Sequence, residues 1–112
     1  MRFIMSAIEL QDARSCFNQC YGQELSELQI QILNKEFSYF LPMDFDNYLI
    51  ECYKQPYAIR MELISITYKV LDPLLEDIVE YQTEYDEELA EECLEQIIDS
   101  KFIQKVLFEK KV

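Results

Sequence analysis

Acidic residues crowd into one part of this chain. The segment 75–100, "LEDIVEYQTEYDEELAEECLEQIIDS", carries eleven carboxylates and no Lys, Arg or His. With Asp72 included, twelve acidic residues lie between Lys69 and Lys101, which equals the whole net charge of −12. The remaining acidic residues are balanced by the 10 Lys and Arg of the chain. The sequence therefore predicts a neutral body with one acidic element, whose field attracts cationic partners and repels nucleic acid and anionic membranes.

Two tyrosines, Tyr81 and Tyr85, stand four residues apart at the start of this segment. Large aromatic side chains carry much of the energy of protein interfaces, and surrounding charge sets the rate and selectivity of association. The alternative is a solvated surface that only aids solubility. Like charges four residues apart destabilise a helix by about 0.2–0.5 kcal/mol a pair, a cost that mixed charges would avoid. The expected partner-binding surface comprises Tyr81, Glu84, Tyr85, Glu87, Glu88, Glu91, Glu92, Glu95 and Asp99.

The other reactive side chains fit no catalytic or metal-binding pattern. The chain has no histidine, and one glycine is too few for phosphate-binding or dinucleotide-binding loops. Cys16 and Cys20 share a face of an expected helix, but Cys52 and Cys93 stand alone, whereas zinc sites use closer pairs. The acidic segment also lacks the glycine and alternating acids of a calcium loop. We expect no catalytic residue, metal or cofactor, and a protein that is not an enzyme.

The N-terminus and the cysteines indicate a compartment. The first charged residues after Arg2, Glu9 and Asp12, come too early for the apolar region of a signal peptide. No apolar stretch approaches the roughly 20 residues that cross a bilayer. We therefore expect a cytoplasmic protein with reduced cysteines and no membrane partner.

Helices are favoured as the elements that position these residues. One glycine and three prolines leave little turn chemistry for β-hairpins. In the first half of the chain, side chains that cap helix N-termini precede apolar stripes, and helix-ending residues follow them. The expected pairs of start and stop are the capping box Ser6/Glu9 with Gly22, the capping box Ser26/Gln29 with Pro42, and Asp44 or Asp46 with Pro56.

The second half of the chain is more ambiguous. The segment Ile59–Val70 is rich in β-branched residues and alternates like a strand, but it also winds as a helix, which we favour. Asp72 before Pro73 predicts a new helix start. The apolar stripe of residues 89–98 is rotated by roughly 80° from that of residues 74–79 when both are wound at 100° per residue. We therefore expect a bend or break near Thr83, capped weakly by Thr83 with Asp86.

Phe102–Phe108 shifts phase again and begins a short helix or a lone strand. We expect an all-α fold, a single domain over residues 1–112 built as a bundle of about five helices. An α+β fold is the alternative if Ile59–Val70 and Phe102–Phe108 are strands. Four lysines near the C-terminus could fold back on the acidic face and lower its charge: Lys101, Lys105, Lys110 and Lys111.

These features favour a protein-binding function. In kind, though by no motif, the small acidic Tyr-bearing chain is similar to immunity proteins that neutralise nuclease toxins and to DNA-mimic inhibitors of defence nucleases. We expect an inhibitor that binds a basic nucleic-acid-handling protein, such as a nuclease, and no nucleic acid directly. The alternative is a helical adaptor or secretion chaperone that holds a protein client in an apolar groove. The tyrosines and phenylalanines also allow a homodimer.

Overall fold

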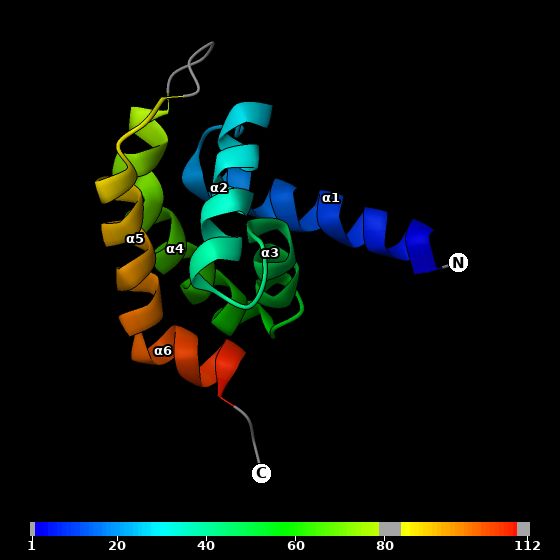
Figure 1. Cartoon of the computed structure of the whole chain (residues 1–112). Coiled ribbons are helices and arrows are strands. Elements are labelled where there is room, and N and C mark those ends of the chain that lie inside the picture. Colours follow the sequence, from blue (N-terminus) through cyan, green and yellow to red (C-terminus); the bar gives the residue numbers. More distant parts are fainter. Residues whose placement is uncertain (1, 79–83, 110–112) are drawn as a thin grey trace.

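The computed structural model describes residues 2–78 and 84–109, with side chains from Glu9 onward. Every regular element in that part of the chain is helical, which confirms the all-α fold. Figure 1 shows α5 running alongside α4, with α2 and α3 beside them and α1 crossing the bundle. The elements are α1 (Arg2–Tyr21), α2 (Glu27–Phe40), α3 (Phe45–Tyr53), α4 (Tyr57–Asp77), α5 (Glu87–Asp99), α6 (Lys101–Ile103) and the π-helical turn η1 (Gln104–Phe108).

Most of the expected helix ends in the first half are confirmed. Gly22 ends α1 with φ +88°, a left-handed conformation that glycine adopts without steric cost. Ser26 and Gln29 form the capping box of α2, each side chain accepting a hydrogen bond from the other's backbone N–H. Asp44, and not Asp46, caps α3 by accepting from the N–H of Asn47 at 2.8 Å. These local signals need no tertiary context, which is why the sequence predicts them.

The expected start of the first helix at Ser6 is wrong. Helix α1 begins at Arg2, so Ser6 lies inside it and does not cap it. A serine followed by a glutamate three residues later also occurs within helices, where both side chains can point to solvent. The capping-box pattern therefore indicates a start only where the preceding residues break the helix, as they do before Ser26.

The expected helix start at Asp72–Pro73 is also wrong. Helix α4 continues through Pro73 to Asp77, and the segment Ile59–Val70 lies within it, so the strand alternative for that segment is wrong as well. A proline inside a helix costs about 3 kcal/mol because it removes a backbone hydrogen bond and crowds the preceding turn. Here the cost is offset by an uninterrupted buried stripe at helical spacing: Leu63, Ile64, Thr67, Leu71, Leu74, Leu75 and Ile78.

The break before α5 is confirmed, although its cap differs from the expected one. Helix α4 ends at Asp77 and α5 begins at Glu87, while Thr83 lies outside the described residues. Asp86 caps α5 by accepting from the N–H groups of Glu88 and Leu89 at 3.0 and 3.1 Å. Ser100 caps α6 by accepting from Ile103 N–H, and residues 102–108 are helical throughout. Their strand alternative is therefore wrong.

The helices enclose one apolar core with an aromatic centre. Its four aromatic side chains are each 0% exposed: Phe17, Phe37, Phe45 and Tyr48. Phe45 packs against Phe17 and Phe37, and Phe37 also packs against Tyr48, at ring centroid distances of 5.0–5.5 Å. The Tyr48 hydroxyl lies 2.7 Å from Thr67 Oγ1, which is also 2.7 Å from the carbonyl of Leu63. Because the single hydroxyl proton of Thr67 goes to that carbonyl, Tyr48 donates to Thr67. Both buried hydroxyl groups are thereby satisfied.

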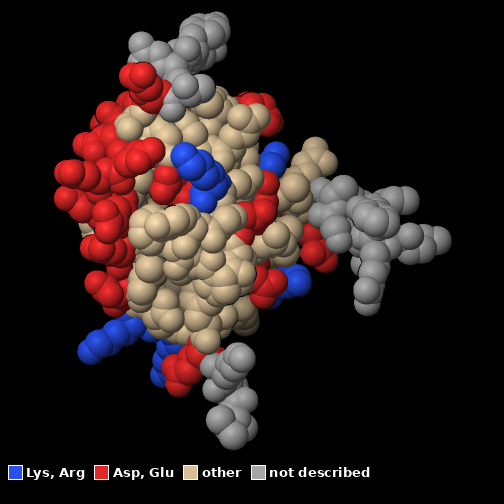
Figure 2. All heavy atoms as spheres, in the orientation of Figure 1, with Lys and Arg blue, Asp and Glu red and all other residues tan. Residues whose placement is uncertain are grey.

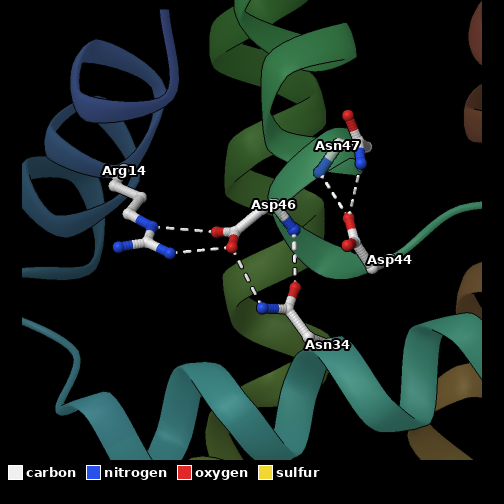
Figure 3. A network of polar contacts seen from close by, with 5 residues as sticks. All are labelled: Arg14, Asn34, Asp44, Asp46 and Asn47. Atoms are coloured by element: carbon white, nitrogen blue, oxygen red, sulfur yellow. Dashed lines mark hydrogen bonds and ion pairs between the residues drawn. The ribbon is translucent and has the colours of Figure 1, made fainter. Parts of the chain in front are cut away.

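A polar network joins α1, α2 and α3 at the edge of this core (Figure 3). The guanidinium of Arg14 donates two hydrogen bonds to the Asp46 carboxylate, at 2.8 and 2.7 Å. Asn34 donates to the same carboxylate at 3.0 Å, and its side-chain oxygen accepts from the N–H of Asp46 at 2.8 Å. Burial opposes ionisation of Asp46, but the hydrogen bonds from Arg14 and Asn34 outweigh it and lower the pKa of that carboxyl. Ionised Asp46 therefore stabilises the fold.

Replacing Asp46 with alanine is expected to lower the free energy of unfolding by about 2 kcal/mol at pH 7, because three charge-assisted hydrogen bonds are lost. A carboxyl whose pKa is lowered by folding stabilises the protein above its unfolded pKa of about 4 and loses that effect as the pH falls through the folded value. Urea unfolding at pH 7 and near pH 2.5 measures the free energy of unfolding with Asp46 ionised and with Asp46 protonated. Wild type and variant should differ at pH 7 and converge in acid; an equal gap at both pH values would contradict the assignment.

Candidate binding surface

The exposed side of α5 carries a continuous acidic face. Figure 2 shows its red side chains as a band along one edge of the molecule, over the position of α5 in Figure 1. The band follows from the sequence spacing, because the opposite side of α5 is buried in the core through Ala90, Cys93, Leu94 and Ile97. We call the following exposed residues the acidic face: Glu84, Glu87, Glu88, Glu91, Glu92, Glu95 and Asp99.

No ion pair within the described residues neutralises the acidic face. The ion pairs found there, Arg14–Asp46 and Lys54–Glu51, lie on α1 and α3. Lys101 and Lys105 are exposed and form no ion pair with α5, while Lys110 and Lys111 lie outside the described residues. Folding back of the C-terminal lysines is therefore not seen as an ion pair at Lys101 or Lys105. In Figure 2 the blue side chains near the C-terminal end of α5 lie below the red band.

Three aspartates that precede α5 in the sequence, Asp72, Asp77 and Asp86, have structural roles that set them apart from the acidic face. Asp86 caps α5, and its own N–H donates to the Asp77 carboxylate at 2.7 Å, which fixes the start of α5 against the end of α4. Asp72 accepts a hydrogen bond from the Tyr21 hydroxyl at 2.8 Å. Burial, followed by this hydrogen bond, raises the pKa of Tyr21 to about 12. These aspartates thus stabilise the fold, and none of them belongs to the acidic face.

Tyr85 lies beside the acidic face, and its hydroxyl is directed towards α2. Its ring is half-buried, and its hydroxyl donates to the carboxylate of Glu36 on α2. Lys35 lies over the same residue, with its Nζ 3.3 Å from the hydroxyl and 5.6 Å from the ring centroid. Burial first, then the contact with Glu36, raises the pKa of Tyr85 well above its ordinary value. Tyr85 therefore links the segment before α5 to α2. Tyr81 lies outside the described residues.

Replacing Tyr85 with phenylalanine is expected to lower the free energy of unfolding by about 1–2 kcal/mol. The hydroxyl bonds a buried carboxylate, Glu36, which is 8% exposed and would lose this partner. Chemical denaturation followed by circular dichroism measures the loss. The control is Tyr57→Phe, at a tyrosine 71% exposed, which should change stability by less than about 0.5 kcal/mol. Equal stability of the two variants would contradict a stabilising role for the hydrogen bond between Tyr85 and Glu36.

An aromatic residue that the sequence analysis missed does stand exposed beside the acidic face. Tyr39, near the end of α2, is 81% exposed and packs edge-on against Phe40, with ring centroids 4.9 Å apart. A groove of about 760 Å³ separates the end of α2 from the start of α5. It is lined by Lys35, Glu36, Ser38, Tyr39, Phe40, Glu87, Glu88 and Glu91. Tyr39 lies about fifty positions before these glutamates, so only the packing of α2 on α5 reveals the association.

Among the described residues, neither the thiols nor the possible metal ligands form a recognisable reactive site. Cys16, Cys20, Cys52 and Cys93 are free thiols, and burial raises the pKa of Cys52 to about 12, which disfavours the reactive thiolate. Within residues 9–78 and 84–109, no three His, Cys, Asp or Glu side chains are grouped as metal ligands. No described helix combines the length and apolarity needed to cross a bilayer. The acidic face and its groove are therefore the candidate binding surface.

Searches of this chain against models of known protein families, curated proteins and solved structures find no match.

Proposed function

We propose that this protein is an inhibitor of the immunity or antitoxin type, which binds a basic nucleic-acid-handling protein through the acidic face. The supporting observation is that all seven carboxylates of this face are exposed and no ion pair among the described residues engages them. A nuclease, whose substrate is a polyanion, presents the complementary positive surface. On this proposal the protein is not an enzyme, works in the cytoplasm, and binds no nucleic acid or membrane itself.

The geometry of α5 also fits mimicry of a nucleic-acid strand. Carboxylates four residues apart on a helix rise by about 6 Å per step, a spacing comparable with that of phosphates. The pairs Glu87/Glu91, Glu88/Glu92, Glu91/Glu95 and Glu95/Asp99 follow this spacing on α5. Glu84 precedes the helix, so the expected pair Glu84/Glu88 does not share this geometry. Four repulsive pairs retained on one short helix favour a surface kept for binding over one that only solvates the protein.

The test is an affinity pull-down from the native host, performed at about 50 mM and 500 mM salt and read by mass spectrometry. Screening shortens the Debye length from about 14 Å to about 4 Å across this range, so a charge-steered complex should weaken strongly. Recovery of a basic nucleic-acid enzyme at low salt only, with its activity inhibited by the pure protein, supports the proposal. Recovery of an uncharged client that survives high salt would contradict it and favour the adaptor or secretion chaperone.

A further inference from the structure

We infer that the groove between α2 and α5 is an arginine-binding site, in which a guanidinium of the partner stacks on Tyr39 and pairs with the glutamates of α5. This inference rests on the proposed function and deepens it, because it specifies the chemistry of the partner segment. The partner would insert an exposed arginine-bearing loop or helix end between the two helices. The rest of the acidic face would then guide that segment by long-range attraction alone.

The shape and charge of the groove carry the first step. Its volume of about 760 Å³ lies within the range of about 300–1,000 Å³ that is usual for ligand pockets, so it can hold side chains and not only a bound ion. Among its lining residues, four carboxylates, those of Glu36, Glu87, Glu88 and Glu91, outnumber the ammonium of Lys35. Lys35 is directed at Tyr85, and it forms no ion pair with a lining glutamate. The groove is thus complementary to a further cation.

The exposed ring of Tyr39, which lines the groove, is the second feature that favours an arginine site. Tyr39 is 81% exposed although a tyrosine ring gains energy from burial, and the edge-on contact with Phe40 supports the ring from one side. The remaining surface of the ring is therefore open to a planar group. Cations lie favourably over such faces, and the gain is about 0.5–1 kcal/mol at an exposed site. An exposed ring and carboxylates in one groove are the two components that recognise a cationic side chain.

The combination favours arginine over lysine. A guanidinium is planar, stacks on aromatic rings and donates paired hydrogen bonds to carboxylates, whereas an ammonium is a compact and strongly hydrated point charge. Glu87 and Glu91 stand one helical turn apart and Glu88 follows Glu87, so the carboxylates approach the groove from the start of α5. One guanidinium can face the ring of Tyr39 while its N–H groups point towards these carboxylates. Acidic charge without the ring would distinguish the two cations less strongly, through the paired hydrogen bonds alone.

The experiment compares two blocked hexapeptides of equal charge, hexa-arginine and hexa-lysine, titrated into the full chain and followed by NMR and calorimetry. Hexa-arginine should bind about two- to five-fold more tightly, the range of an exposed cation–π contact, and should shift the ring resonances of Tyr39. Tyr39→Ala should reduce the preference, because hexa-arginine loses more affinity than hexa-lysine when the ring is removed. The matched control is Tyr57→Ala, which truncates the other strongly exposed tyrosine among the described residues and should retain the preference.

Each outcome decides the inference separately from the proposed function. Equal affinities for the two peptides, an undiminished preference in Tyr39→Ala, or no binding of either peptide would overturn the arginine site. If the host protein were nevertheless retained in a salt-sensitive way, the proposed inhibitor function would stand with a different contact. If the peptides behaved as expected but the pull-down retained no basic protein, the groove would be an arginine site and the inhibitor function would fail.

Discussion

Replacing Phe37 with alanine should lower the free energy of unfolding by about 3–5 kcal/mol. Phe37 is 0% exposed and contacts both Phe45 and Tyr48, each at a centroid distance of 5.0 Å, so its removal leaves a cavity between α2 and α3. Folded domains of this kind are stable by only about 5–15 kcal/mol, so one truncation removes a large fraction of the total. Urea unfolding followed by circular dichroism measures the change.

Tyr57→Ala serves as the control for the Phe37 prediction, because it also truncates an aromatic side chain but at a site 71% exposed. It should change the free energy of unfolding by less than about 0.5 kcal/mol. A loss below about 1 kcal/mol for Phe37→Ala would mean that the aromatic centre is not tightly packed. The packing of α2 on α3 would then be weaker than the structure indicates, and the position of Tyr39 near the end of α2 would be less well fixed.

The sequence predicts the parts of this fold that depend on neighbouring residues. Gly22, the Ser26/Gln29 capping box and Asp44 each determine a helix end through local backbone geometry, and all three act as expected. The acidic face is predicted for a similar reason, because the 3.6-residue period of α5 separates its buried and charged sides. Such predictions hold because no distant segment can change which side chains share one face of a helix.

The features that the sequence does not reveal depend on contacts between distant segments. Local rules place a helix start at Pro73, yet burial of the long stripe of α4 outweighs the cost of the proline. Tyr85 and Tyr39 have nearly opposite roles from those that their positions suggest. Tyr85 lies in the acidic segment but is fastened to Glu36, whereas Tyr39 is distant in sequence but lines the groove. Only the packing of α2 against α5 brings Tyr39 beside the acidic face and Tyr85 against Glu36.

Reversing Glu88, Glu91 and Glu95 to lysine should weaken binding of the partner recovered at low salt by roughly a hundredfold. Each reversal removes an attraction and adds a repulsion, and exposed pairs are worth about 0.2–1 kcal/mol each. Six such changes amount to about 3 kcal/mol, or two orders of magnitude in the dissociation constant. Most of the loss should appear in the association rate and should shrink as salt is added, because steering acts at long range. Surface plasmon resonance across a salt series measures both quantities.

The same variant also separates binding from folding. On α5 the reversals convert three of the four repulsive pairs at four-residue spacing to attractive ones, while position 91 still repels positions 88 and 95. The variant should therefore unfold at the same or a slightly higher temperature while it loses its partner. Asp12, Glu24 and Glu62, three exposed acids outside the acidic face, supply a control with the same change in net charge when reversed to lysine. If this control weakened binding as much, total charge alone would explain the attraction, and the acidic face would have no specific role.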